Sequence, residues 1–212
     1  MALFYLVRHG RNDFLGKALA ARLPGVHLNA LGRAEADALA EALAHKGIER
    51  ILSSPLERAR ETAEPLAKRM GKEIEISEQI NELGFGDWAG KSMPELELLP
   101  EWKLFNSFRT GTRPPGGETM LEVQARMVAA VEHCLQAEAK TFAFFSHADP
   151  IRSLLSYYLG MPLEMFSRIE ISPGSYSLLR VEKWGAQILA MNASPFGMIG
   201  MIGTDPSAHQ IF

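Results

Sequence analysis

The sequence opens with Leu3-Phe4-Tyr5-Leu6-Val7-Arg8-His9-Gly10, and this stretch decides the fold. A short apolar run that ends at a polar turn is typical of a buried central strand in an α/β sheet. In open sheets of this class the ligand crevice lies beyond the carboxyl ends of the strands. The stretch therefore predicts a central strand with a candidate functional residue, His9, directly after it.

Helical and strand patterns alternate after this first strand. Asn29 is suited to cap a helix over residues 30–46 that ends at Gly47. Residues 48–53 resemble a second strand, and Ser54 predicts an N-cap for a helix with Pro55 in its first turn, Glu57 in a capping box and an end near Gly71. Further elements are expected as strands at 73–76, 141–145, 168–172, 175–182 and 187–191 (the last two as a hairpin about 183–185) and as helices at 119–139 and about 150–159.

This alternation predicts an α/β fold, a three-layer α/β/α sandwich with a mostly parallel central sheet and a small cap insertion. We expect one domain over residues 1–193. Residues 81–118 have weak periodicity, with two short helical stretches, and are expected to form the cap, in which Phe85 and Trp88 pack. Residues 194–212 mix Met, Gly and Pro without a period, so no element is predicted for this tail.

Composition and charge limit the classes of partner. The formal net charge is −3 and the Lys and Arg residues are dispersed, so we expect no nucleic-acid partner and no anionic membrane surface. The apolar run over residues 2–7 is too short for a signal peptide or a membrane span. The single cysteine, Cys134, cannot form an internal disulfide and fits a reducing cytoplasm. Any anion that this chain binds must be held locally.

Two more residues stand where an anion site would need them. His147 follows the predicted strand 141–145, as His9 follows the first strand. Arg58 lies in the first turn of a predicted helix, where free backbone N–H groups favour an anion. Glu82 lies in a stretch rich in carboxylates and by spacing alone would be a loop acid, while Arg60 fits a solvated helix face.

Together these segments resemble the histidine phosphatase (phosphoglycerate mutase-like) superfamily, in its phosphatase-like branch. The matching segments occur in the family's order and span residues 3 to about 181. They are Arg8-His9-Gly10, Leu28-Asn29-Ala30-Leu31-Gly32-Arg33, Ser53-Ser54-Pro55-Leu56-Glu57-Arg58-Ala59, Asn81-Glu82-Leu83-Gly84-Phe85-Gly86-Asp87-Trp88-Ala89-Gly90, Pro115-Gly116-Gly117-Glu118 and Ser146-His147.

The resemblance implies a catalytic set of His9, Arg8, Arg58, His147 and Glu82. His9 is implied as the nucleophile, Arg8, Arg58 and His147 as ligands of the phosphoryl oxygens, and Glu82 as the general acid. A neutral imidazole is a competent nucleophile, and fixed cationic donors stabilise the charge on the transferring group. The implied reaction needs no metal ion and no cofactor. The implied substrate is a small phosphate ester.

The residues just after His9 depart from the family pattern. Most members have an acidic residue or glutamine and then a hydroxyl residue, whereas this chain has Arg11-Asn12-Asp13. Asn12 is expected to supply an amide donor to the substrate, and Arg11 either extends the positive mouth of the pocket or pairs with Asp13. The Trp-Asn pair of the mutases is missing, which argues against close kinship with glycolytic mutases. Residues 22–29 are similar to a bacterial subgroup of probable phosphomutases.

Four functions stay open at this stage. A metal-independent phosphatase acting on a small phosphomonoester leads, and a phosphomutase is second. A non-catalytic binding protein needs no acid beside an anion pocket, and a metal hydrolase using His9, His147 and Glu82 lacks a tight ligand spacing. Arg11, Arg109 and Arg113 are candidates for recognising a second anion. Both a monomer and a homodimer are compatible with the sequence.

Overall fold

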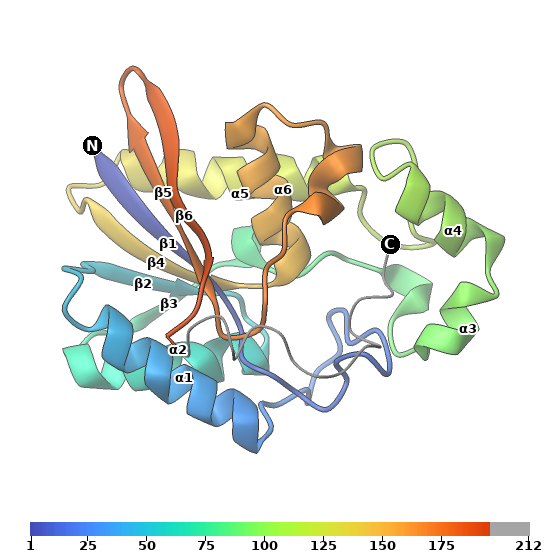
Figure 1. Ribbon diagram of the computed structural model, residues 1–212, viewed down its shortest axis with the longest axis horizontal. Helices are drawn as coiled ribbons and strands as arrows, with labels where there is room; N and C mark the ends of the chain where they lie inside the picture. Colours follow the sequence, from blue (N-terminus) through green and yellow to red (C-terminus); the bar gives the residue numbers. More distant parts are fainter. Residues whose placement is uncertain (196–212) are drawn as a thin grey trace.

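Six strands form one sheet in the order β3-β2-β4-β1-β5-β6 (Figure 1). The computed structural model describes residues 1–195, so the tail prediction lies outside the described residues from residue 196 onward. The strands are β1 (Ala2–Arg8), β2 (Arg50–Ser53), β3 (Ile74–Ile76), β4 (Thr141–Ser146), β5 (Tyr176–Glu182) and β6 (Gly185–Ala193).

The sheet is mostly parallel, as predicted. β1 lies beside β4, and β2 joins β4 to β3, with all four strands parallel. β5 runs antiparallel to β1 and forms the predicted hairpin with β6. In the register of β1 and β4, Arg8 is opposite Ser146, so His9 and His147 follow at the same edge of the sheet.

Helices cover both faces of this sheet, which confirms the three-layer prediction (Figure 1). On one face α1 (Ala30–Leu43) and α2 (Glu57–Met70) pack Leu39, Leu43 and Leu66 against strand residues that include Val7 and Phe145. On the other face α5 (Met120–Leu135) and α6 (Ala148–Leu159) contribute to a larger core with the alternate strand residues, among them Phe4, Leu6, Phe142 and Phe144. Alternate residues of one strand thus supply two separate cores.

The segment expected to form a cap contains three short elements. These are η2 (Gly86–Trp88), α3 (Met93–Glu97) and α4 (Pro100–Ser107), and α3 and α4 lie at one end of the molecule, to the right of the sheet in Figure 1. Phe85, Trp88, Trp102 and Phe105 are buried and pack ring against ring, which confirms the packing role expected for Phe85 and Trp88. The remaining 3-10 turns are η1 (Glu78–Ile80) and η3 (Leu163–Arg168).

Helix ends follow the local sequence where side chains can reach the backbone. Asn29 accepts a hydrogen bond from the N–H of Gly32, and Gly71 ends α2 in the left-handed conformation, both as predicted. Thr119 and Glu122 form a capping box at the start of α5. None of the helices within residues 1–195 is long and apolar enough to cross a membrane.

Two predicted elements were wrong. Ser54 does not cap α2, which starts at Glu57, because its buried hydroxyl group bonds side chains of other segments. Residues 168–172 are not a strand, because β5 occupies the place beside β1. The backbone carbonyls of this stretch accept arginine N–H groups instead: Ile169 from Arg152 and Ile171 from Arg8.

Candidate active site

His9 and His147 lie side by side at the carboxyl ends of β1 and β4. Their ring centroids are 5.1 Å apart, with the ring planes at 61°. The backbone N–H of His9 donates to the carbonyl of Ser146 over 3.0 Å, which continues the ladder between the two strands. Both side chains are buried. The sheet therefore brings together the two histidines that the sequence placed at separate strand ends.

The hydrogen bonds of His9 indicate which ring nitrogen carries the proton and which the lone pair. Nδ1 lies 2.7 Å from the carbonyl oxygen of Gly10, which can only accept, so we assign the proton to Nδ1. Nε2 then carries the lone pair, and it accepts a hydrogen bond from Nε of Arg58 over 3.2 Å. Gly10 itself is held by Thr62 of α2, whose hydroxyl accepts its N–H at 3.0 Å. The imidazole thus presents an unprotonated nitrogen to Arg58.

Arg58 and Arg8 bring two guanidinium groups to the histidines. Arg58, in the first turn of α2, is 1% exposed, and its Nη2 donates to the backbone carbonyl of Ala21 over 2.7 Å. Arg8, the last residue of β1, donates Nη1 to the carbonyl of Ile171 over 2.5 Å. Burial lowers the pKa of Arg8 to about 10, so this side chain stays charged at neutral pH.

Glu82 reaches the second histidine through a small polar network. Its Oε2 lies 3.7 Å from Nδ1 of His147, and its Oε1 accepts the N–H of Leu83 at 2.8 Å. Nε2 of His147 lies 2.8 Å from the hydroxyl of Ser54, which donates to Asn81 over 3.2 Å. Because the Ser54 proton is used toward Asn81, His147 carries its own proton on Nε2 and turns Nδ1 toward Glu82.

The electrostatic surroundings give these groups distinct protonation states. Burial, and then the positive charges of Arg58 and Arg8, lowers the pKa of His9 well below its usual range, so its ring is neutral at neutral pH. Burial and the charge of Arg58 do the same to the pKa of His147. Burial, and then the negative charge of Asp149, raises the pKa of Glu82 to about 7. A neutral imidazole on His9 and a protonated carboxyl group on Glu82 can therefore coexist near neutral pH, as nucleophilic and acid catalysis by such groups would require.

Three buried nitrogens of the site make no hydrogen bond within residues 1–195. They are Nε of Arg8, Nη1 of Arg58 and Nδ1 of His147. Unsatisfied buried polar groups cost free energy and are rare in folded proteins. Two of the three, on Arg8 and Arg58, belong to cationic side chains, and an anion with several oxygens would satisfy them.

Comparisons with known proteins identify the family of this chain. Residues 4–194 match the family model described as the histidine phosphatase superfamily (branch 1). The chain belongs to this superfamily. Uncharacterized protein Rv0525 of Mycobacterium tuberculosis is 34% identical over 75% of this chain and 79% of its own length. The probable phosphoglycerate mutase GpmB of Escherichia fergusonii is 31% identical over 90% of this chain and 89% of its own.

A solved structure in the histidine phosphatase superfamily has the same fold. It is the mycobacterial glucosyl-3-phosphoglycerate phosphatase Rv2419c in complex with VO3, with a TM-score of 0.83 and 26% identity, covering 92% of this chain and 100% of that chain. The resemblance to the superfamily and the α/β fold are thus confirmed. The missing Trp-Asn pair argued against close kinship with glycolytic mutases. A probable phosphoglycerate mutase is nevertheless among the relatives, so phosphoryl transfer between hydroxyl groups stays the second candidate activity.

The residues that depart from the superfamily's pattern after His9, Arg11 and Asn12, bond to other parts of this protein. Arg11 forms an ion pair with the buried carboxylate of Glu35, and its backbone N–H donates to the same carboxylate at 2.8 Å. It therefore neither pairs with Asp13 nor turns its charge to the histidines. Asn12 is buried, and its Oδ1 accepts the N–H of Phe14 at 3.0 Å, which closes a turn next to the site.

The other candidates for a second anion site are also engaged. Arg109 is buried over the rings of Phe105 and Phe166 and pairs with Asp149 at 3.1 Å. Arg113 is an exposed residue that pairs with Glu122 at 2.7 Å. The three arginines that the sequence suggested for a second anion are therefore not brought together.

Sequence reasoning missed several residues that contact the site. Ser54 was read as a helix cap, although it orients His147. Asp149, whose charge raises the pKa of Glu82, lies two residues after His147 in the first turn of α6, and that position was the available signal. Arg22 gave no signal, because its partners Glu82 and Glu118 are remote in sequence.

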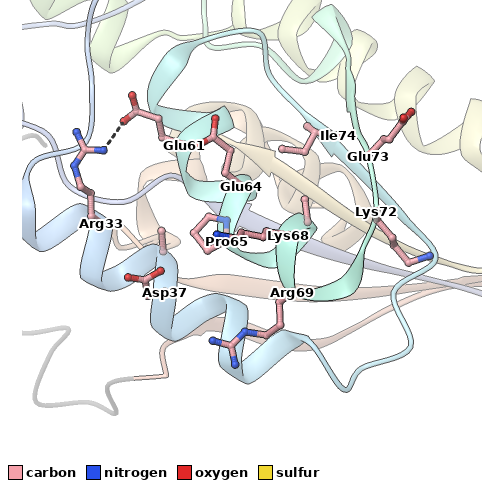
Figure 2. A pocket seen from close by; sticks show the side chains of 12 residues that line it. Arg33, Asp37, Glu61, Glu64, Pro65, Lys68, Arg69, Lys72, Glu73 and Ile74 are labelled. Atoms are coloured by element: carbon pink, nitrogen blue, oxygen red, sulfur yellow. Dashed lines mark ion pairs between the residues drawn. The ribbon is translucent and has the colours of Figure 1, made fainter.

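A groove lined by residues of α1 and α2 and by the start of β3 has a volume of about 1200 Å³ (Figure 2). It does not include any of the residues above. Its charged lining alternates in sign and includes Arg33, which faces Glu61 at 3.9 Å. The carboxylates offset the cations there, so this groove has no preference for an anion. Among residues 1–195 no group of three metal-ligating side chains converges.

Proposed function

We propose that this protein is a metal-independent phosphatase that hydrolyses a small phosphomonoester through a phosphohistidine on His9. The observation that carries the proposal is the pair of unpartnered buried guanidinium nitrogens, on Arg8 and Arg58, beside a histidine whose lone pair is on Nε2. These nitrogens are donors for phosphoryl oxygens, and the unpartnered Nδ1 of His147 becomes a third donor once the charge of the bound phosphate has led it to take up a proton. The vanadate complex of the mycobacterial phosphatase supports this assignment by analogy.

In the first step Nε2 of His9 attacks phosphorus and the bond from phosphorus to the ester oxygen breaks. In the structure Nε of Arg58 donates a hydrogen bond to that nitrogen. When substrate binds, this N–H must instead donate to a phosphoryl oxygen, so that the lone pair of Nε2 is free to attack. Arg8 and Arg58 then stabilise the charge on the phosphoryl oxygens, His147 joins them once its Nδ1 is protonated in the presence of the bound phosphate, and Asn12 is a further donor in the proposal. Protonated Glu82 transfers its proton to the leaving oxygen, so that the product is a neutral alcohol.

In the second step water attacks the phosphohistidine. Glu82, now ionised, accepts the proton of that water, the bond between Nε2 and phosphorus breaks, and inorganic phosphate leaves. The pKa of about 7 for Glu82 suits both its roles, because the acid and base forms are then nearly equal in free energy at neutral pH. Arg11 is left out of the substrate set, because its charge is paired with Glu35.

The proposal is tested with purified protein, p-nitrophenyl phosphate and a panel of metabolite phosphates, with and without EDTA. We expect phosphate release that survives EDTA and is lost in His9→Ala, with the exposed His45→Ala variant as the matched control. Retention of turnover in His9→Ala would overturn the proposal, and so would its loss with EDTA.

A phosphomutase is the second candidate, favoured by the similarity to a probable phosphoglycerate mutase. The two activities share the first step and differ in the acceptor. The two are separated by forming the phosphohistidine in the native enzyme, chasing with water alone or with an added alcohol, and quenching samples over time to measure the phosphohistidine that is left. Faster decay in the presence of the alcohol, with a phosphate ester as product, would favour the mutase.

A further inference from the structure

The main-chain carbonyl of Glu82 accepts hydrogen bonds from two arginines that come from different parts of the chain. Nε of Arg22 donates to it over 2.7 Å, and Nη2 of Arg126 over 2.9 Å. Nη1 of Arg126 also donates to the carbonyl of Asn81 over 2.7 Å. The main-chain carbonyls of both Asn81 and Glu82 are therefore held by guanidinium groups.

Glu118 connects the two arginines to each other. Its Oε2 accepts Nη2 of Arg22 at 2.6 Å and the N–H of Gly84 at 2.9 Å. Arg126 donates to both oxygens of this carboxylate, each over 3.2 Å. The N–H of Glu118 in turn donates to the carbonyl of Gly84 over 2.7 Å. This network of Arg22, Glu118 and Arg126 surrounds the Glu82 loop on its backbone side.

The residue before Arg22 contacts the other half of the active site. Ala21 is buried, has a φ of 44° and gives its carbonyl oxygen to Nη2 of Arg58 at 2.7 Å. The left-handed conformation costs a non-glycine residue about 1–2 kcal/mol, so it persists only where the surroundings enforce it. Of two consecutive residues, Ala21 thus contacts Arg58 and Arg22 contacts the Glu82 loop.

We infer that Arg22 is a positioning residue that orients Glu82 for proton transfer and couples its loop to Arg58 through Ala21. The inference rests on the proposed function. Arg22 bonds only the backbone of Glu82, so it acts on the direction of the carboxyl group and takes no part in bond making. Its side chain is 37% exposed, whereas that of Arg126 is 16% exposed, so Arg22 can be replaced with less damage to folding.

The test compares two substrates that differ in their need for a proton. The aryl oxygen of p-nitrophenyl phosphate leaves as a stable anion, whereas the alkyl oxygen of glycerol 2-phosphate needs the proton of Glu82. For Arg22→Met we expect kcat/KM for the alkyl ester to fall about 10- to 100-fold, because a displacement near 1 Å has effects of that order. For the aryl ester we expect a fall of about threefold or less. kcat/KM is used because it reports the steps up to phosphorylation of His9 with both esters.

Arg180→Met is the matched control, because Arg180 lies on β5 and pairs with Glu182. It should leave the ratio of the two kcat/KM values unchanged. Arg22→Lys is a second variant that keeps the charge but cannot reach both acceptors with a planar fork, so it should show the same selectivity to a smaller degree. Equal losses on both esters, or no loss on the alkyl ester, in Arg22→Met and in Arg22→Lys would overturn the inference.

The His9→Ala variant separates this inference from the proposed function. If His9→Ala hydrolyses either ester, the proposed function fails and the role of Arg22 fails with it. If His9→Ala is inactive while the Arg22 variants lack selectivity between the esters, the phosphatase mechanism stands and only the inference is lost.

Discussion

Replacing Glu82 with glutamine should stabilise the folded protein at alkaline pH. The Glu82 side chain is only 14% exposed and feels the negative charge of Asp149, and this environment disfavours its charged form. Glutamine has nearly the same shape, and its carbonyl oxygen can keep the bond from the N–H of Leu83. The substitution therefore removes an ionisation while it leaves the contacts of the side chain in place.

The magnitude follows from the raised pKa of Glu82. A carboxyl whose folded pKa exceeds its unfolded value contributes its full stability below the unfolded pKa and loses it as pH rises toward the folded pKa. For Glu82 this window runs from 4.5 to about 7. At about 1.4 kcal/mol per pH unit, the wild-type protein should lose about 3 kcal/mol relative to Glu82→Gln across this window, and nothing further above it.

Urea denaturation of both proteins at pH 5, 6, 7 and 8 measures this difference. The difference in free energy of unfolding should grow from pH 5 to pH 7 and then become constant. The exposed Glu101→Gln on α4 is the matched control, because its carboxyl is in contact with water before and after unfolding. A difference for Glu82→Gln that does not change with pH would refute the reasoning, because Glu82 would then ionise as readily in the folded chain as in the unfolded one.

Three other predictions concern single residues. Above pH 7 the single-turnover release of alcohol from an alkyl phosphate should fall about tenfold per pH unit as Glu82 loses its proton, and a flat profile in that range would contradict its role as acid. Gly32→Ala should destabilise the fold by about 1–3 kcal/mol in urea titrations, because the new Cβ would lie 2.0 Å from a backbone oxygen; the stabilisation usual for alanine in a helix would contradict this. Arg109→Met should cost about 2–3 kcal/mol, because half-buried Asp149 would keep only Arg152, at 3.5 Å, as a cationic partner. Adding Asp149→Asn should recover part of that loss in thermal melts, and a further loss would contradict the reasoning.

The position of the central elements could be predicted because they depend on short-range patterns. The apolar runs before His9 and His147 indicate buried strands, and both histidines lie at the same edge of one sheet. Arg58 lies in the first turn of its helix as expected, although that helix begins later than Ser54 suggested. Glu82 has no such local pattern, and only the family resemblance pointed to it.

The parts that could not be predicted depend on pairs of residues distant in sequence. The tetrad beginning with Ser54 fits a capping box, yet the Ser54 hydroxyl bonds His147 because β2 and β4 are neighbours. Arg11 forms its ion pair with Glu35, a residue inside α1, and not with its near neighbour Asp13. Such choices follow from which segments the fold packs together, and local propensity does not contain that information.

The adjacency of β1 and β4 has a consequence for how the active site tolerates sequence change. Neighbouring strands lie about 4.8 Å apart in any sheet, a value set by the backbone hydrogen bonds. The two imidazole rings are 5.1 Å apart, close to that spacing. Their separation thus follows from main-chain geometry. A lineage can replace most of its core residues and still keep these two positions side by side, provided that the sheet is kept; a phosphatase of 26% identity keeps the same fold, with a TM-score of 0.83.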